Sequence, residues 1–197
     1  PIIIRDFIKS YPDVSFSLLD KDSKDVINSV LNADTDFGIV GAKYPHDSLS
    51  YIELMEDQLV LIAPNNKLYT KENYSTLKLE EILDKRFIFR EEGSGTRALL
   101  ENKIKEKNID ISELSILAYI EDTETIKELV SLGLGISFIS KKAIKDDIES
   151  KKYKAYYVEE LELNRKFYFV YHNRRQLSPL NDTFKNFVLD YIKVFSK

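Results

Sequence analysis

The segment best suited to ligand binding is a short turn between an apolar strand and a helix. It reads Gly93-Ser94-Gly95-Thr96-Arg97 and follows the apolar residues 87–89. The glycines let the backbone approach a ligand closely, and Ser94 and Thr96 supply hydroxyls. The first N–H groups of a helix favour negative charge, and Arg97 can add a charge-assisted contact. The pattern therefore predicts a site for a small anion or carboxylate, with a simple helix cap as the alternative.

Three further loops are expected near this turn. Asp122 and Thr123 follow a predicted strand at 117–120 and precede a helix, where the alternative for Thr123 is a capping role. Ser23 follows an alternating apolar segment, and Gly41 and Ala42 follow an apolar strand. Ligands of α/β folds bind beyond the carboxyl ends of strands, so a ligand held between two lobes would touch loops of both.

The sequence offers little for catalysis or metal binding. His46 and His172 are the two histidines, and neither has a ligand partner at the spacing of a metal site. Ser94 does not lie in a G-x-S-x-G turn, because position 92 is Glu. Glu91 and Glu92 remain as a weakly supported acid and base pair. We predict a binding protein rather than an enzyme, with no catalytic residues, no metal ion and no cofactor.

Composition excludes several other classes of protein. Of the 197 residues, 43% are hydrophobic and 31% charged, which is typical of a globular chain. A net charge of -4 argues against nucleic-acid binding by the general surface, and the basic cluster at 151–154 is interpreted as solvated surface. The absence of Cys excludes disulfides and suits a reducing compartment such as the cytoplasm. No apolar run is long enough to span a membrane.

Strands and helices alternate along the chain, which predicts an α/β fold with largely parallel sheets. The predicted strands cover residues 14–19, 37–40, 59–63, 87–89, 117–120, 136–139 and 167–171. Helices are expected up to Tyr11, around Val26 and Val30, after Thr96, from Thr123 to Gly133, and around Phe184. Residues 61–64 and 169–171 are candidate crossings between two lobes. If they lie side by side, residues 1–62 with 171–197 form one lobe and residues 63–170 form the other.

Six segments in order resemble the effector-binding domain of LysR-type transcriptional regulators. They are residues 7–14 (FIKSYPDV), 31–40 (LNADTDFGIV), 59–64 (LVLIAP), 90–97 (REEGSGTR), 129–136 (LVSLGLGI) and 169–171 (FVY). Each is weak alone, but six with the family spacing are specific. The resemblance covers essentially the whole chain. It implies two Rossmann-like lobes of the type II periplasmic-binding-protein kind, joined by two crossing strands.

The resemblance also implies which residues bind and which partners exist. Ser23, Gly41 and Ala42 would line the cleft from the first lobe, and residues 93–97 from the second, with Asp122 and Thr123 nearby. The effector would be a small anion: sulfate, sulfite, a phosphorylated metabolite or a carboxylate. An oxyanion-binding protein of a transport system and an enzyme on the same fold are the alternative functions.

The chain begins at Pro1 without an initiator Met, and we interpret it as a fragment, with a processed mature protein as the alternative. The resemblance implies a winged helix-turn-helix domain before Pro1, which alone would contact DNA. The family's first strand and its Ser/Thr-rich turn are also expected there. The resemblance implies homodimers that assemble further in the full-length regulator, with the helix that carries Val26 and Val30 as one possible contact surface, and no membrane partner is expected.

Overall fold

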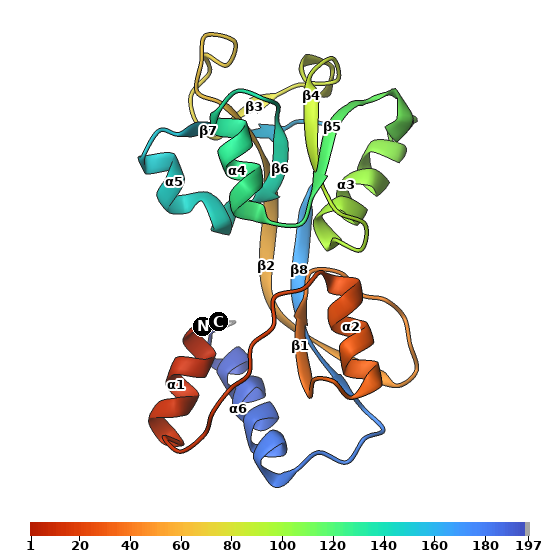
Figure 1. Ribbon diagram of the computed structural model, residues 1–197, viewed down its shortest axis with the longest axis vertical. Helices are drawn as coiled ribbons and strands as arrows, with labels where there is room; N and C mark the ends of the chain where they lie inside the picture. The colour runs from red at the N-terminus through yellow and green to blue at the C-terminus, as the bar shows by residue number, and fades with distance from the viewer. Residues whose placement is uncertain (196–197) are drawn as a thin grey trace.

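The computed structural model describes residues 1–195 and has two lobes joined by two long strands (Figure 1). These strands are β2 (Leu49–Pro64) and β8 (Asn164–His172), which run antiparallel from the pair Leu49 and His172 to the pair Gln58 and Asn164. Lobe I, the lower lobe in Figure 1, contains both described ends of the chain. Lobe II contains the middle of the chain. The predicted α/β fold of two lobes joined by two crossing strands is confirmed.

The crossing lies earlier in β2 and β8 than predicted. Residues 61–64 pair with β6 (Ser137–Ser140) and β7 (Tyr153–Val158), whereas residues 169–171 pair with residues 50–52. The predicted segments therefore do not face each other. The strands cross between the lobes at residues 53–58 and 164–168. Because no helix covers them there, exposed residues such as Met55 are tolerated, and the crossing lacks the apolar run that marks a buried strand.

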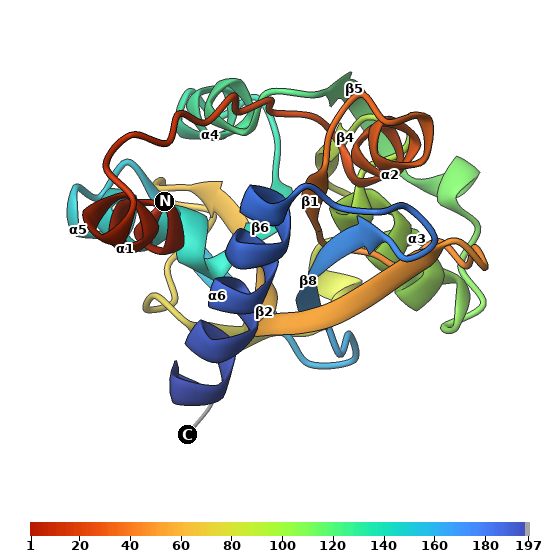
Figure 2. The same cartoon turned by 90° about the horizontal axis from the view of Figure 1, so that it is seen from below.

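Lobe I is built on the sheet order β1-β8-β2, which Figure 2 shows from below. Its elements are α1 (Ile2–Ser10), α2 (Ser23–Asn32), β1 (Phe37–Val40), parts of β2 and β8, and α6 (Pro179–Phe195). Phe7 of α1 is fully buried against Phe184 and Phe187 of α6, with ring centroids 5.0 and 5.2 Å away. In α2, Val30 is fully buried in the lobe's core, and Val26 packs against the same core. Val30 is therefore unavailable to a partner chain, whereas Val26 is only partly buried.

The strand predicted at residues 14–19 does not form. This segment runs between α1 and α2 without regular structure, and Leu18 and Leu19 are 71% and 59% exposed. A strand needs a neighbour whose N–H and C=O groups complete the ladder. Within residues 1–195, β1 pairs only with β8, and no strand lies between β1 and this segment. The alternation of apolar and polar residues is therefore not enough to make this segment a strand.

Lobe II contains the second half of β2 together with β6, β7 and β3 (Ser75–Leu77), and the pair β4 (Arg86–Arg90) and β5 (Ser115–Ile120). The helices are α3 (Gly95–Lys105), α4 (Thr123–Ser131) and α5 (Lys145–Glu149), with the 3-10 turns η1 (Leu79–Glu81), η2 (Ile111–Glu113) and η3 (Lys141–Ile144). A single parallel bridge between Phe87 and Ile136 connects β4 to the rest of the lobe.

The prediction of largely parallel sheets is wrong. Only β3 with β7, β4 with β5, and the bridge from Phe87 to Ile136 are parallel. The other four strand pairs are antiparallel. In three of them β2 runs opposite to β6, β7 or the returning β8, and in the fourth β1 runs opposite to β8. The strand β7 was also missed. Lys151 and Lys152, directly before it, are exposed, but Tyr153 and Tyr156 within it are fully buried.

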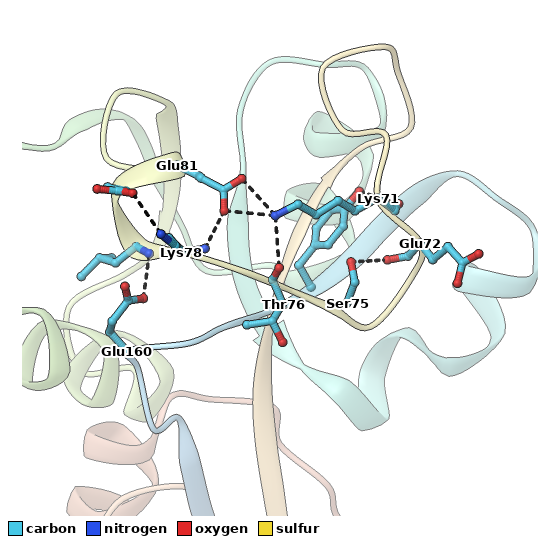
Figure 3. Close-up of polar contacts among 10 residues, drawn as sticks. Lys71, Glu72, Ser75, Thr76, Lys78, Glu81 and Glu160 are labelled. Carbon is cyan, nitrogen blue, oxygen red and sulfur yellow. Dashed lines mark hydrogen bonds and ion pairs between the residues drawn. The ribbon is translucent and has the colours of Figure 1, made fainter.

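A polar network holds the end of lobe II that lies far from lobe I (Figure 3). Lys71 Nζ donates to Glu81 Oε1 at 3.0 Å and to the carbonyl of Thr76 at 3.3 Å. Glu81 Oε2 also accepts the backbone N–H of Lys78 at 2.7 Å, and Glu160 accepts that of Leu79 at 2.8 Å. These bonds connect β3 and η1 to the loop after β7, so we assign them a structural role. No helix among residues 1–195 is both long enough and apolar enough to cross a membrane.

Candidate functional site

The Gly-Ser-Gly-Thr turn lies where lobe II meets lobe I. Gly93 has φ +95°, a left-handed conformation that favours glycine. Ser94 is the N-cap residue of α3, but its side chain forms no hydrogen bond with the helix. Ser94, Gly95 and Thr96 are nearly buried. The first N–H groups of α3 are thus directed into the junction without a side-chain cap from their own helix.

Loops of lobe I contact this turn directly. A Cβ atom on Gly95 would lie 3.1 Å from the carbonyl carbon of Gly41 and 3.2 Å from the backbone nitrogen of Ala42. A Cβ atom on Gly93 would lie 2.8 Å from Asp22 Oδ1. A side chain at Gly93 would displace the Asp22 carboxylate, and a side chain at Gly95 would push against the Gly41-Ala42 loop. In this arrangement the turn and the Gly41-Ala42 loop fill the space between them.

Ser23 and Asp22 position the lobe I side of the junction. Ser23 Oγ accepts a hydrogen bond from the Gly41 N–H at 3.1 Å, which fixes the Gly41-Ala42 loop against the start of α2. Asp22 caps α2, because its Oδ1 accepts from the Asp25 N–H at 2.9 Å. Residues from two separate segments of lobe I are thereby brought together with the turn before α3, as the sequence predicted.

Arg165 of β8 connects the crossing strands to α3. Its Nη1 donates to Thr96 Oγ1 at 2.9 Å, and its Nε donates to Asp57 Oδ2, also at 2.9 Å. Asp57 Oδ1 accepts from the Ser140 hydroxyl at 2.7 Å. The Asp57 side chain is fully buried and that of Arg165 is 10% exposed. Burial lowers the pKa of Arg165, and the attraction of Asp57 opposes this shift.

Neither Asp57 nor Arg165 was identified from the sequence. The available signal was a charged residue just before each of two apolar runs, since Asp57 lies two residues before the buried residues 59–63 and Arg165 lies two residues before residues 167–171. The register of β2 and β8, which places the two residues opposite each other, is a tertiary property.

Arg97 does not point into the junction. Its Nε donates to Glu101 Oε1 at 2.6 Å, one helical turn further along α3. Its guanidinium also lies 4.4 Å from the centre of the Tyr119 ring of β5. The side chain therefore follows the outer surface of lobe II, away from the start of the helix.

At the start of α4, the capping residue is Asp122 and not Thr123. Asp122 Oδ2 accepts from the N–H and the hydroxyl of Thr125, at 2.7 and 2.6 Å. These hydrogen bonds lower the pKa of the exposed Asp122 carboxyl. Thr123 is the first helical residue, and its hydroxyl accepts from Arg90 Nη1 at 3.3 Å. Thr123 is thus connected to the end of β4, where Arg90 also pairs with Glu91 at 2.7 Å.

Open space lies beside the crossing strands. A cavity of about 770 Å³ is bounded by residues of β2 and β8 on one side and of η3 and α5 on the other. Within residues 1–195, no group of His, Cys, Asp or Glu side chains is arranged to hold a metal ion. The two histidine rings accept hydrogen bonds from nearby backbone, His46 from Ser48 and His172 from Arg174.

Two lobes joined by crossing strands, with helix starts at their junction, define a ligand-binding domain of the type II periplasmic-binding-protein kind. The family model described as "LysR substrate binding domain" matches residues 1–193, and the chain belongs to this family. The family is an effector-binding domain of transcriptional regulators and not a family of enzymes.

Individual relatives agree with this assignment. A probable RuBisCO transcriptional regulator of Phaeodactylum tricornutum is 26% identical over 189 residues, which is 94% of this chain and 61% of the relative. The effector-binding domain of QuiR, solved in complex with shikimate, has a TM-score of 0.86 at 26% identity and covers 99% of this chain and 90% of that one. The regulatory domain of Synechocystis PCC6803 CcmR, solved in complex with 2-PG, has a TM-score of 0.85 at 25% identity, with coverages of 99% and 91%.

The chain spans about three fifths of the length of the curated relatives that it matches. These relatives are regulators, and they support the effector-binding prediction over the transport alternative.

Proposed function

We propose that this effector-binding domain takes a small anionic molecule at the junction where α3 meets lobe I. The observation that carries the proposal is the start of α3, which is buried, has no side-chain cap of its own and is directed at the Gly41-Ala42 loop. Backbone N–H groups at a helix start favour negative charge. The Arg165 guanidinium, bonded to Thr96, adds positive charge at the same place.

Relatives support an acidic ligand. The QuiR domain was solved with shikimate and the CcmR domain with 2-PG. For this chain we infer the same general class: sulfate, sulfite, a phosphorylated metabolite or a carboxylate. The proposed contacts are the N–H groups and hydroxyls of residues 93–97, with Ser23, Gly41 and Ala42 from lobe I and Asp122 and Thr123 at the margin.

A ligand at this place requires the lobes to separate. Even a Cβ atom on Gly95 would lie only 3.1 Å from the carbonyl carbon of Gly41, so an anion fits between the two loops only if the lobes move about β2 and β8. A ligand with different affinities for the separated and the contacting arrangement shifts the balance between them. The domain would thereby convert ligand binding into a change of shape.

Calorimetry on the chain with sulfate, phosphate, shikimate and 2-PG tests this site. Thr96→Val removes the hydroxyl at the start of α3 and keeps the side-chain shape, so we expect roughly tenfold weaker binding. Thr183→Val is the matched control, because the Thr183 hydroxyl only bonds the Pro179 carbonyl within α6. Equal affinity for the wild type and Thr96→Val would remove the ligand from this junction.

For the full-length protein we propose a cytoplasmic homodimeric transcriptional regulator that binds DNA through a winged helix-turn-helix domain outside this chain. The family match and the regulator relatives support this proposal. Sedimentation of the full-length protein with and without its DNA site tests it, and a monomer at micromolar concentration would contradict it.

A further inference from the structure

The cavity beside the crossing strands is distinguished by its charge. Five basic residues line it: Lys141, Lys142, Lys145, Arg165 and Lys166. The acidic residues in its lining are Glu56 and Asp57. Since basic residues outnumber acidic ones in a concave wall, the local potential is positive even though the whole chain carries a net charge of -4.

The acidic residues do not neutralise this wall. Both carboxylate oxygens of Asp57 are already bonded, one to the Ser140 hydroxyl and the other to Arg165. Lys166 pairs at 2.8 Å with Glu53, which lies outside the cavity lining. Glu56 is exposed on β2 and is the remaining acidic side chain. The charge of the three lysines of η3 and α5 is therefore left largely uncompensated.

These three lysines lack acidic partners in the described part of the chain. Lys142 and Lys145 are exposed, and neither makes an ion pair within residues 1–195. Lys141 Nζ donates to the Tyr157 hydroxyl at 2.6 Å and lies 5.0 Å from the centre of the Tyr74 ring. Because η3 and α5 are consecutive, they bring all three ammonium groups to one wall of the cavity.

We propose that this cavity binds a small molecule carrying two or more anionic groups, phosphate or carboxylate. Lys142 and Lys145 would contact the anionic groups, since their ammonium groups have no other acidic partner. The amides of Gln58 and Asn164, which also line the cavity, supply neutral hydrogen bonds. The volume of about 770 Å³ is within the usual range for small-molecule sites.

This site is separate from the one proposed at α3. The cavity contains no residue of the Gly-Ser-Gly-Thr turn, and its argument does not depend on an anion at that turn. Arg165 connects the two places, because its guanidinium borders the cavity and also bonds Thr96. A multiply charged ligand in the cavity would thus lie next to the ion pair that joins the crossing strands.

Calorimetry with inorganic pyrophosphate and with citrate tests the proposal and distinguishes phosphate from carboxylate ligands. We expect millimolar or tighter binding of at least one of them, and roughly tenfold weaker binding of phosphate or acetate, which carry a single anionic group. Pyrophosphate binding alone would indicate a phosphorylated ligand, and citrate binding alone a polycarboxylate. Binding of neither ion at millimolar concentration would overturn the proposal.

A double variant locates the site. Lys142→Gln with Lys145→Gln should weaken binding by roughly tenfold or more, because two direct contacts lose their charge. The matched control is Lys67→Gln with Lys107→Gln, which removes two exposed lysines that lie outside the cavity and make no ion pair in the described chain. A loss below threefold in the control supports a local site. Equal losses in both double variants, or none in the first, would overturn it.

Discussion

The buried pair of Asp57 and Arg165 is the residue-level feature that joins the crossing strands to the candidate site. The two side chains lie opposite each other in the register of β2 and β8, and both carboxylate oxygens of Asp57 are satisfied. Arg165 then reaches α3 through Thr96. Paired charges with complete hydrogen bonding are tolerated in a protein interior, whereas removal of one partner leaves the other buried and uncompensated.

We therefore expect Asp57→Asn to lower the free energy of unfolding by roughly 3 kcal/mol, because Arg165 keeps its charge without a carboxylate. Urea unfolding followed by circular dichroism measures this change. Glu53→Gln is the control, since its pair with Lys166 is exposed, with 56% and 41% of the side chains accessible. It should leave the urea midpoint unchanged. Equal midpoints for Asp57→Asn and the wild type would show that the pair contributes no stability.

A second prediction at this scale concerns pH. Asp147 Oδ2 accepts from Lys127 Nζ at 2.7 Å and from the Tyr153 hydroxyl at 2.8 Å. The hydrogen bond from Lys127 is the largest cause of the lowered pKa of Asp147 in the folded protein. A lowered carboxyl pKa contributes stability that is complete above the unfolded value of about 3.9 and is lost as the pH falls through the folded value.

Asp147→Asn should therefore be less stable than the wild type near neutral pH, and the difference should shrink on acidification below about pH 4. Urea midpoints of both proteins over this range measure it. Lys127 contributes with the opposite dependence: burial alone would lower its pKa, but hydrogen bonds to Asp147 and Glu124 raise it. A difference between the proteins that stays constant down to pH 3 would contradict the assignment to Asp147.

At the scale of elements, the turn before α3 depends on glycine for two separate reasons. Gly93 has φ +95°, and a Cβ atom there would also meet the Asp22 carboxylate of lobe I. Gly133 after α4 has φ +81°, but a Cβ atom would have no neighbour within 4 Å. A substitution at Gly133 therefore introduces backbone strain alone, whereas a substitution at Gly93 introduces backbone strain and a contact with lobe I.

Gly133→Ala should cost about 1 kcal/mol of stability, from strain alone. Gly93→Ala should cost roughly twice as much or more, because the new methyl also collides with Asp22 or separates the lobes. Differential scanning calorimetry of both variants tests this order. A similar loss in both would mean that the Asp22 side chain moves away freely and that the lobes are not in tight contact there.

The elements also show what the sequence could and could not predict. The apolar residues 37–40 became β1 without change in bounds, and the strand, turn and helix around residues 93–97 were placed correctly. Those signals are local. The segment 14–19 has an equally regular alternation but no strand beside it, and β7 is directly preceded by two exposed lysines that resemble a solvated loop. In both segments, the presence or absence of a neighbouring strand determines whether a strand forms.

In the candidate site, too, local signals could be predicted from the sequence and tertiary contacts could not. Ser23, Gly41 and the turn at 93–97 were predicted to meet, and they do meet, because strand ends and helix starts are marked by local residue types. The direction of the Arg97 side chain along α3 depends on its contacts with Glu101 and Tyr119. The position of the Arg165 side chain between the crossing strands and α3 depends on its pair with Asp57. These contacts arise only from the tertiary fold.

At the scale of the whole molecule, the two lobes differ in the size of their cores. Lobe II contains two clusters with 18 and 9 buried hydrophobic residues, whereas the described cluster around β1 in lobe I contains five. Apolar burial is the main favourable term in folding. We therefore expect lobe I to open locally at lower free energy than lobe II, even though β2 and β8 are shared by both.

Native-state hydrogen exchange measured by mass spectrometry tests this expectation. Amides of β1, at the edge of the lobe I sheet, should exchange at least tenfold faster than those of β6, which pairs with β2 inside lobe II. A ligand bound between the lobes should slow the exchange of β1 most, because binding stabilises the folded arrangement that contacts it. Equal protection of β1 and β6 would mean that the lobes unfold as one unit, and protection gained only in lobe II would place the ligand away from the junction.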